Sequence, residues 1–231
     1  MSDLAHLKIW DDPAIRDSLS WYLEVAANRR PAKCRIASTL ATHIDPAASS
    51  EAALWAELDR LTPIFVRRWQ AIRAGASLPA TADGSSLLEL CRELAYRMLA
   101  HCNFCPWNCR VDRVAGAKFG ACKLASASRV SSYFHHTGEE LFYHGTEGSG
   151  TIFFTSCNMR CAFCQNGDIS TDKDNGEETD PRTLAAMGVD TAPRRLSQHQ
   201  LGRRRSGYPL ACHRRCDRPV GPRLHAHAGR A

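Results

Sequence analysis

Apolar residues recur every three or four positions in the first part of the chain, the pattern of helices that bury one face. The first run predicts a helix that begins at Pro13, because proline fits a first helical turn, and ends before Arg29-Arg30-Pro31. Its apolar positions are Ile15, Leu19, Tyr22, Leu23 and Ala26. Cys34 follows in a predicted linker, where we expect a small buried side chain rather than a ligand.

Two further helices are predicted between Ser49 and a linker at 75–84. The second helix begins at Ser49 or Ser50. A third is predicted at Thr62-Pro63, since threonine caps a helix and proline fits its first turn. The apolar stripe of these helices comprises Trp55, Leu58, Phe65, Trp69 and Ile72. Residues 75–84, rich in Ala, Pro, Ser and Thr, predict a loop.

A fourth helix is predicted from the capping box Ser86-Leu87-Leu88-Glu89 to the vicinity of His101. One face of this helix holds Leu87, Leu90, Cys91, Leu94, Ala95, Met98 and Leu99. The four runs together predict a helical region over residues 1–100.

After residue 130 the pattern changes from helix to strand. Val130 to His144 predicts a strand or hairpin with a polar turn at 135–140. The histidines and glutamates of that turn either bind a metal or move protons, or they form a solvated turn. A second apolar run, 151–155, follows Gly148-Ser149-Gly150 and predicts a short buried strand that leads into a loop.

This loop lies in the stretch 150–166, GTIFFTSCNMRCAFCQN, and carries Cys157, Cys161 and Cys164. Three thiols at C-x3-C-x2-C spacing can turn inward on one small centre. A [4Fe–4S] cluster held by three thiolates keeps one iron open to a ligand, whereas four thiolates close it. The alternatives are a zinc knuckle that borrows a fourth ligand and reduced structural thiols, although structural zinc usually shows paired C-x2-C knuckles.

A second group of cysteines, Cys102, Cys105, Cys109 and Cys122, precedes the predicted strands in a Gly-containing loop region. Four thiolates can close a tetrahedron, and the C-x2-C start favours a structural zinc ion. An auxiliary iron–sulfur cluster and unligated thiols are the competing interpretations, since four cysteines alone do not select a metal.

Composition limits the cellular setting and locates the charge. With 44% hydrophobic residues the 231-residue chain can bury a core, and we find neither an apolar run of membrane-spanning length nor a secretory signal. We therefore expect a cytoplasmic protein with no membrane partner and with reduced thiols. The net charge of +6 arises from residues 188–231, which hold ten arginines against two aspartates.

The stretch from Cys102 to Ile169 resembles the radical S-adenosylmethionine (radical SAM) enzymes. Within these enzymes it resembles a subgroup that is similar to the pyruvate formate-lyase activating enzyme and is often called PflX-like. Matching positions are Cys102, Cys105, Pro106, Cys109, Asp112, Arg113, Gly120, Cys122, His136, Gly138, Glu139, Glu140 and Gly145, followed by the block 148–166.

The resemblance implies an α/β fold with a partial (β/α) barrel and the cluster at the mouth of the first strand. It implies that Cys157, Cys161 and Cys164 bind a [4Fe–4S] cluster, that SAM occupies the open iron, and that Phe163 packs near the adenine. Reductive cleavage of SAM then yields a 5′-deoxyadenosyl radical, which abstracts hydrogen from a substrate that the sequence does not identify, a protein being one option. A flavodoxin or ferredoxin would supply the electron.

The barrel pattern stops after about residue 187. Residues 181–187 predict the start of a helix, but 188–231 contain no Ile, Phe, Trp, Glu, Lys or Asn and predict a disordered tail. A frameshift after Met187, giving a truncated enzyme, is our preferred interpretation. Nucleic-acid binding by the arginines is the less favoured one.

The predicted domains are therefore a helical region at 1–100, a Cys-rich metal-binding segment at 101–148, the start of the radical SAM core at 149–187, and the tail at 188–231. Because the rest of the barrel is missing from the pattern, a catalytically inactive iron–sulfur or zinc-binding fragment is the alternative to an active enzyme. The oligomeric state has no signal in the sequence.

Overall fold

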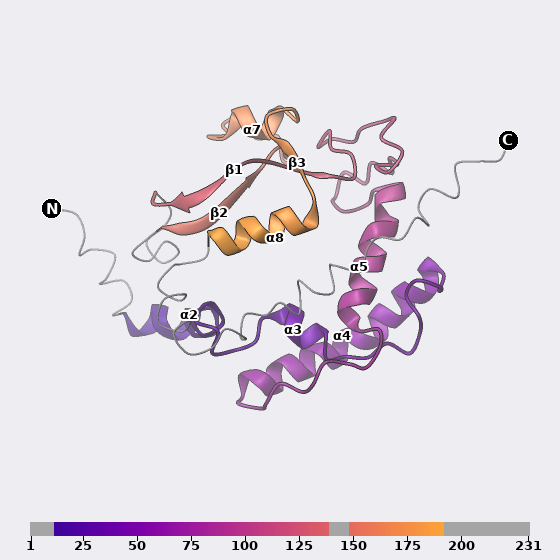
Figure 1. The fold of residues 1–231 in the computed structure, drawn as a ribbon, viewed down its shortest axis with the longest axis vertical. Coiled ribbons are helices and arrows are strands. Elements are labelled where there is room, and N and C mark those ends of the chain that lie inside the picture. The colour runs from indigo at the N-terminus through magenta and orange to yellow at the C-terminus, as the bar shows by residue number, and fades with distance from the viewer. Residues whose placement is uncertain (1–11, 139–147, 192–231) are drawn as a thin grey trace.

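The computed structural model describes residues 12–138 and 148–191, which form helices and one small sheet (Figure 1). The helices are α2 (Pro13–Ala26), α3 (Lys33–Ala37), α4 (Glu51–Arg73), α5 (Leu87–Met98), the 3-10 helix η1 (Leu99–His101), α7 (Gly167–Thr171) and α8 (Pro181–Asp190), and the strands are β1 (Ser128–His136), β2 (Ser149–Phe154) and β3 (Glu177–Thr179). The predicted combination of helices and strands is confirmed at this coarse level. Glu139, Glu140, Gly145 and residues 192–231 lie outside the described residues.

Two predicted helix starts are confirmed by their caps. α2 begins at Pro13, and the Asp12 carboxylate accepts a hydrogen bond from the backbone N–H of Ala14 at 2.8 Å. α4 begins after Ser50, whose hydroxyl oxygen accepts from the N–H of Ala53 at 3.3 Å. In both cases a side-chain oxygen satisfies a backbone donor that the first turn of a helix leaves free.

The predicted helix start at Thr62-Pro63 is wrong, because α4 runs without a break through Pro63. The Thr62 hydroxyl donates back to the carbonyl oxygen of Leu58 at 2.7 Å instead of capping a new helix. Proline removes only one helical hydrogen bond, and the helix packs against the core on both sides of Pro63, through the buried Leu61 before it and the partly buried Ile64 and Phe65 after it.

The core of the helical part lies between α3, α4 and α5. Its buried residues are Leu40, Leu54, Leu61, Leu87, Leu90 and Leu94. The capping box is confirmed, since the backbone N–H of Ser86 donates to the Glu89 carboxylate at 3.0 Å. Five predicted positions of the buried helical faces are wrong, because their side chains are exposed: Tyr22, Ala26, Trp55, Cys91 and Ala95. α5 contacts α3 and α4, and its buried residues are Leu87, Leu90 and Leu94.

The three strands form an antiparallel sheet in the order β2-β1-β3. His135 pairs with Gly150, so His135 and His136 belong to β1 and not to the predicted polar turn. The ring nitrogens of His135 are buried and find no hydrogen-bond partner among the described residues, and the predicted role of 135–140 stays a prediction. β2 is half-buried rather than buried, and its Phe154 is 47% exposed.

Helix α8 packs against β2 and begins at Pro181, as predicted, with Asp180 as its cap (Figure 1). Its C-cap Thr191 lies close to Gly150: a Cβ atom at position 150 would be 2.1 Å from the Thr191 carbonyl oxygen. The first three residues of the predicted tail, 188–190, are part of this helix. Within the described residues, no helix has both the length and the apolar composition that crossing a bilayer requires.

Candidate functional site

The loop that carries Cys157, Cys161 and Cys164, hereafter the three-cysteine loop, follows β2 directly. Its base is fixed at two points: the Thr155 N–H donates to the Arg129 carbonyl oxygen at 3.0 Å and the Ser156 N–H to that of Ile169 at 2.7 Å. Ser156 and Arg160 have φ angles of 66° and 54°. Each left-handed residue immediately precedes a cysteine and turns the chain, which keeps the three thiols on one compact loop.

Hydrogen-bond donors point at two of the three sulfurs. The Met159 N–H donates to Cys157 Sγ at 3.3 Å, and the Ser170 hydroxyl donates to Cys164 Sγ at 3.4 Å. Cys161 is exposed, and all three thiols are free of disulfides. These two contacts fix the positions of the Cys157 and Cys164 sulfurs on the loop.

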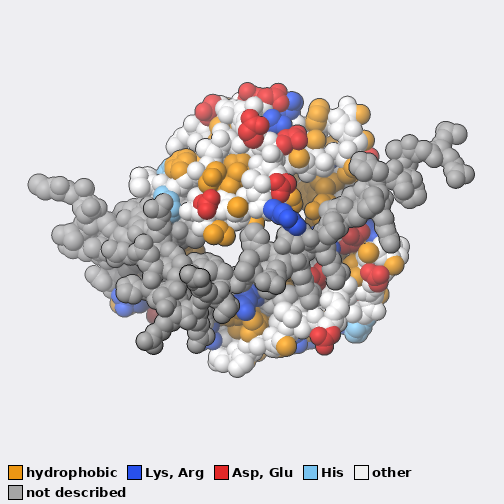
Figure 2. All heavy atoms as spheres, in the orientation of Figure 1, with side chains coloured by type: hydrophobic (Ala, Val, Ile, Leu, Met, Phe, Trp, Pro, Cys, Tyr) orange, Lys and Arg blue, Asp and Glu red, His pale blue; other side chains and the backbone are white. Residues whose placement is uncertain are grey.

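The tip of the three-cysteine loop presents apolar side chains outward. Phe163 is 88% exposed and Met159 is 72% exposed. Figure 2 shows hydrophobic side chains at the surface of the part that contains the sheet. The ring of Phe163 is therefore accessible on the described surface.

The four-cysteine segment, residues 102–122, closes on itself through backbone hydrogen bonds. The Cys102 N–H donates to the Val111 carbonyl oxygen at 3.0 Å, and the Arg110 N–H donates to the Cys102 carbonyl oxygen at 2.9 Å. On the other side the Ala121 N–H points at Cys109 Sγ at 3.4 Å. These contacts bring Cys102, Cys109 and the chain just before Cys122 into one small region.

Arg113 connects the two ends of this segment. Its Nε donates to Cys102 Sγ at 3.0 Å and its Nη2 donates to Cys122 Sγ at 2.8 Å. The Arg113 N–H is held by the Leu99 carbonyl oxygen at 2.8 Å, which ties the segment to η1. One guanidinium group thus faces two sulfurs that are twenty positions apart in the sequence.

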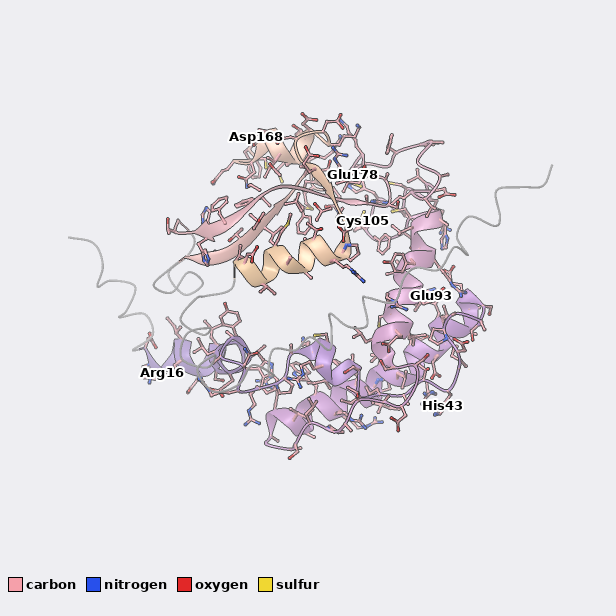
Figure 3. All side chains as sticks on the ribbon, viewed as in Figure 1. Arg16, His43, Glu93, Cys105, Asp168 and Glu178 are labelled. Atoms are coloured by element: carbon pink, nitrogen blue, oxygen red, sulfur yellow. The ribbon has the colours of Figure 1, made fainter. Side chains whose placement is uncertain are left out.

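The four-cysteine segment and the three-cysteine loop touch each other. The Trp107 indole N–H donates to the Asn158 carbonyl oxygen at 2.7 Å. A hydrogen bond from the Asn158 side chain, with help from the backbone N–H of Trp107, lowers the pKa of the Cys105 thiol. Cys105 is labelled in Figure 3, at the sheet end of the molecule and far from His43 of the helical part. The two groups of cysteines therefore form one continuous region.

Among the described residues, no group of three or more His, Cys, Asp or Glu side chains is close enough together to hold a metal ion. Around a single zinc ion, with Zn–S bonds of about 2.3 Å, sulfurs lie about 3.8 Å apart. In a [4Fe–4S] cluster the thiolates bind different irons and are spread more widely. The three-cysteine loop fits a cluster in donor type and number, and the metal sites at both cysteine groups stay predictions.

Sequence reasoning missed the residues that organise the cysteines. Arg113 was recognised only as a matching position, and neither Trp107 nor Asn158 was singled out. A weak signal was present, since the Arg and Trp lie between cysteines and Asn158 directly follows Cys157. The pairing of Arg113 with two distant sulfurs depends on how the segment closes, which no local pattern records.

Comparison with known proteins gives one partial match. Eighty-five residues of the chain, 37% of its length, are 41% identical to the uncharacterized protein MJ0674 of Methanocaldococcus jannaschii. The chain covers 23% of that relative. No protein-family model matches the chain. No solved structure matches it either.

Proposed function

We propose that the protein is a radical SAM iron–sulfur enzyme in which Cys157, Cys161 and Cys164 hold a [4Fe–4S] cluster. The observation that carries this proposal is the placement of three free thiols on one loop, with hydrogen-bond donors directed at two of the sulfurs. Hydrogen bonds to the sulfurs are among the factors that set the potential of a protein-bound cluster. The resemblance of residues 102–169 to PflX-like proteins supports the assignment to this class.

The chain's own residues would bind and orient the cofactors. When bound, the cluster supplies the electron that cleaves SAM to methionine and a 5′-deoxyadenosyl radical. Cys157, Cys161 and Cys164 would hold the cluster with three thiolates, which would leave one iron open to SAM. The exposed ring of Phe163 offers an apolar face to the adenine, and the Ser170 and Met159 donors hold the sulfurs in place.

The partners of such an enzyme are part of the same proposal. An electron donor of the flavodoxin or ferredoxin type would reduce the cluster, and the substrate, a protein among the options, would be the hydrogen donor. The nine cysteines of the described residues are thiols rather than disulfides, which supports a reducing, cytoplasmic setting.

The proposal is tested by anaerobic reconstitution with iron and sulfide, followed by dithionite, SAM and chromatographic detection of 5′-deoxyadenosine. We expect a brown protein with the electron paramagnetic resonance signal of a reduced [4Fe–4S] cluster and with SAM cleavage. Cys157→Ser, Cys161→Ser and Cys164→Ser should each abolish cleavage, whereas Cys34→Ser and Cys91→Ser, outside both cysteine groups, should keep it. Absence of both colour and signal in the parent protein would overturn the proposal.

An inactive iron–sulfur or zinc-binding fragment is the second candidate. It is favoured by the described sheet, which has three antiparallel strands rather than the parallel strands of a barrel, and by the 23% coverage of the relative. Reconstituted protein that shows the cluster signal but releases no 5′-deoxyadenosine would favour this candidate over the enzyme.

A further inference from the structure

The loop after α2, helix α3 and the second half of α4 carry positive charge that nearby carboxylates do not balance in the sequence. Residues 27–44 hold four Lys or Arg side chains and no Asp or Glu, and residues 61–82 hold three and none. The chain between these two runs differs, since residues 45–60 contain four carboxylates against one arginine. Charge is therefore segregated within the helical part.

Contacts between the elements bring the two basic runs together. The Arg30 guanidinium donates to the Ile72 carbonyl oxygen at 3.3 Å, and that of Arg68 donates to the Thr39 carbonyl oxygen at 2.8 Å. Helices α2, α3 and α4 lie together on one side of the molecule in Figure 1. Their cations form one surface, hereafter the basic patch, which comprises Arg30, Lys33, Arg35, Arg67, Arg68 and Arg73.

Two tryptophans hold cations in place on the basic patch. The Lys33 ammonium nitrogen lies 4.5 Å from the centroid of the Trp69 ring, and the guanidinium carbon of Arg73 lies 5.4 Å from the same centroid. The guanidinium carbon of Arg73 is also 5.9 Å from the centroid of the Trp21 ring, which belongs to α2. The aromatic faces attract these cations, so the two charges stay close to each other despite their mutual repulsion.

The basic patch is not neutralised by acidic side chains. Within residues 12–138 and 148–191, no ion pair includes any of its six cations, and Arg29 at its edge is already paired with Glu24 at 2.7 Å. Lys33, Arg35 and Arg67 are exposed. A group of like charges without counter-charges creates a positive potential, which attracts anions from solution.

The layout of the basic patch indicates what kind of anion fits it. Its cations are spread over the α2–α3 loop, α3 and α4 and do not converge on one point, which suits an extended anion with repeated charges. Five of the six are arginines, whose planar fork pairs with phosphate oxygens. Nucleic-acid interfaces are much more positively charged than protein–protein interfaces, whose centres are depleted of charge.

We infer that the basic patch binds the phosphate backbone of a nucleic acid. Contacts to phosphate position a nucleic acid without reading its sequence, so the expected binding is independent of sequence. The patch belongs to the helical part. It requires neither the proposed radical SAM chemistry nor the arginines of residues 188–231.

The test measures the fluorescence anisotropy of a labelled single-stranded RNA of about 20 nucleotides, titrated with the full chain between about 50 and 200 mM KCl. A DNA duplex of the same length is titrated in parallel. The patch variant carries Lys33→Ala, Arg35→Ala and Arg67→Ala, which are exposed and lie outside the leucine core. We expect this variant to bind the preferred nucleic acid about 10- to 100-fold more weakly, with a salt dependence of log K that is less steep by about 2 to 3.

The matched control removes one lysine and two arginines from exposed positions outside the basic patch. It carries Arg110→Ala, Lys118→Ala and Arg160→Ala. Residues 188–231 are the same in the parent and in both variants, so their arginines contribute equally to all three titrations. We expect the control to bind within about threefold of the parent, and circular dichroism to show the same helix content in both variants.

Three results would contradict the inference. Absence of binding to both nucleic acids near 50 mM salt is the first. The second is an equal loss of affinity in the patch variant and the control, which would assign binding to net charge. The third is binding to phosphatidylserine vesicles that the patch variant loses while its nucleic-acid affinity is unchanged, which would make the patch a membrane-contact surface. None of these measurements involves iron, sulfide or SAM, so the basic patch and the proposed enzyme can fail independently.

Discussion

Glu57 of α4 is a carboxylate buried against the helical core, with 6% of its surface exposed. The Arg60 guanidinium donates to both of its oxygens, at 2.6 and 2.7 Å, and the His43 N–H donates at 2.7 Å. The hydrogen bonds from Arg60 lower the pKa of Glu57 to about 2, against the opposing effect of burial. We therefore expect Glu57 to contribute to the acid sensitivity of the helical part.

Because the pKa of Glu57 is lower in the folded chain, its stabilisation is complete above about pH 4.5 and is lost as the pH falls toward 2. Arg60 is one-third exposed, so screening reduces the contribution to about 1–2 kcal/mol. We expect Glu57→Gln to lower the free energy of unfolding by this amount at pH 7. In this variant the free energy of unfolding should also fall less steeply between pH 4.5 and 2.

Urea unfolding followed by circular dichroism at pH 7, 4 and 3 measures this effect. Glu93→Gln, which breaks the part-buried pair with Arg97 on α5, is the control; because Glu93 is more exposed than Glu57, this substitution should cost less than half as much. Parallel pH profiles for the parent and Glu57→Gln would show that other groups set the acid sensitivity.

At the scale of elements, Trp107 makes one of the contacts between the four-cysteine segment and the three-cysteine loop. Its indole N–H donates to the carbonyl oxygen of Asn158, and the residue as a whole is 58% exposed. A hydrogen bond of this kind contributes about 1 kcal/mol. Trp107→Phe keeps an aromatic ring and removes the donor, so we expect amide exchange in 157–164 to become about fivefold faster.

Hydrogen exchange with mass spectrometry on the metal-free full chain measures the exchange rates of these amides. Phe104→Leu changes another exposed aromatic residue of the same segment and should leave 157–164 unchanged. If Trp107→Phe also leaves these amides unchanged, the indole does not hold the loop.

Pro63 is the second element-scale feature, because it occupies the interior of α4. Proline there removes one helical hydrogen bond, so we expect Pro63→Ala to raise the free energy of unfolding by roughly 1–3 kcal/mol. Thermal unfolding measures the change, and Ala56→Ser, at an exposed position of α4, is the control for surface substitution in the same helix. A lower stability of Pro63→Ala would mean that the proline ring packs favourably.

At the scale of the whole molecule, the helices and the sheet have separate interiors. Every residue of the leucine core comes from positions before 95, whereas the sheet packs through β1, β2 and α8. The four-cysteine segment connects the two parts in Figure 1, at the end of α5. Each part can therefore lose structure without direct loss of side-chain contacts in the other.

Leu90→Ala tests this independence, because Leu90 is fully buried in α5. Truncation of a buried leucine costs about 2–5 kcal/mol. We expect faster amide exchange throughout α3–α5 and unchanged protection in β1 and β2, measured by hydrogen exchange. Equal loss of protection in the sheet would show that the chain unfolds as one cooperative unit.

The sequence by itself determined most helix starts and the location of both cysteine groups, because caps and apolar periodicity act between neighbours along the chain. Ser50, Ser86 and Pro181 each mark a helix start that the structure contains. Local signals predicted the wrong structure at two places. At Thr62-Pro63 the sequence favours a helix start, but packing on both sides keeps α4 continuous. His135 was predicted in a turn, but it pairs with β2 and belongs to β1.

Only the tertiary structure decided what the cysteines face. Arg113 meets Cys102 and Cys122, and Trp107 meets Asn158, because segments distant in sequence close on each other. The antiparallel order of the sheet was likewise beyond the local pattern, since a strand's periodicity does not name its partner. Residue spacing specifies which thiols can share a metal, whereas the charges and donors around them depend on long-range contacts.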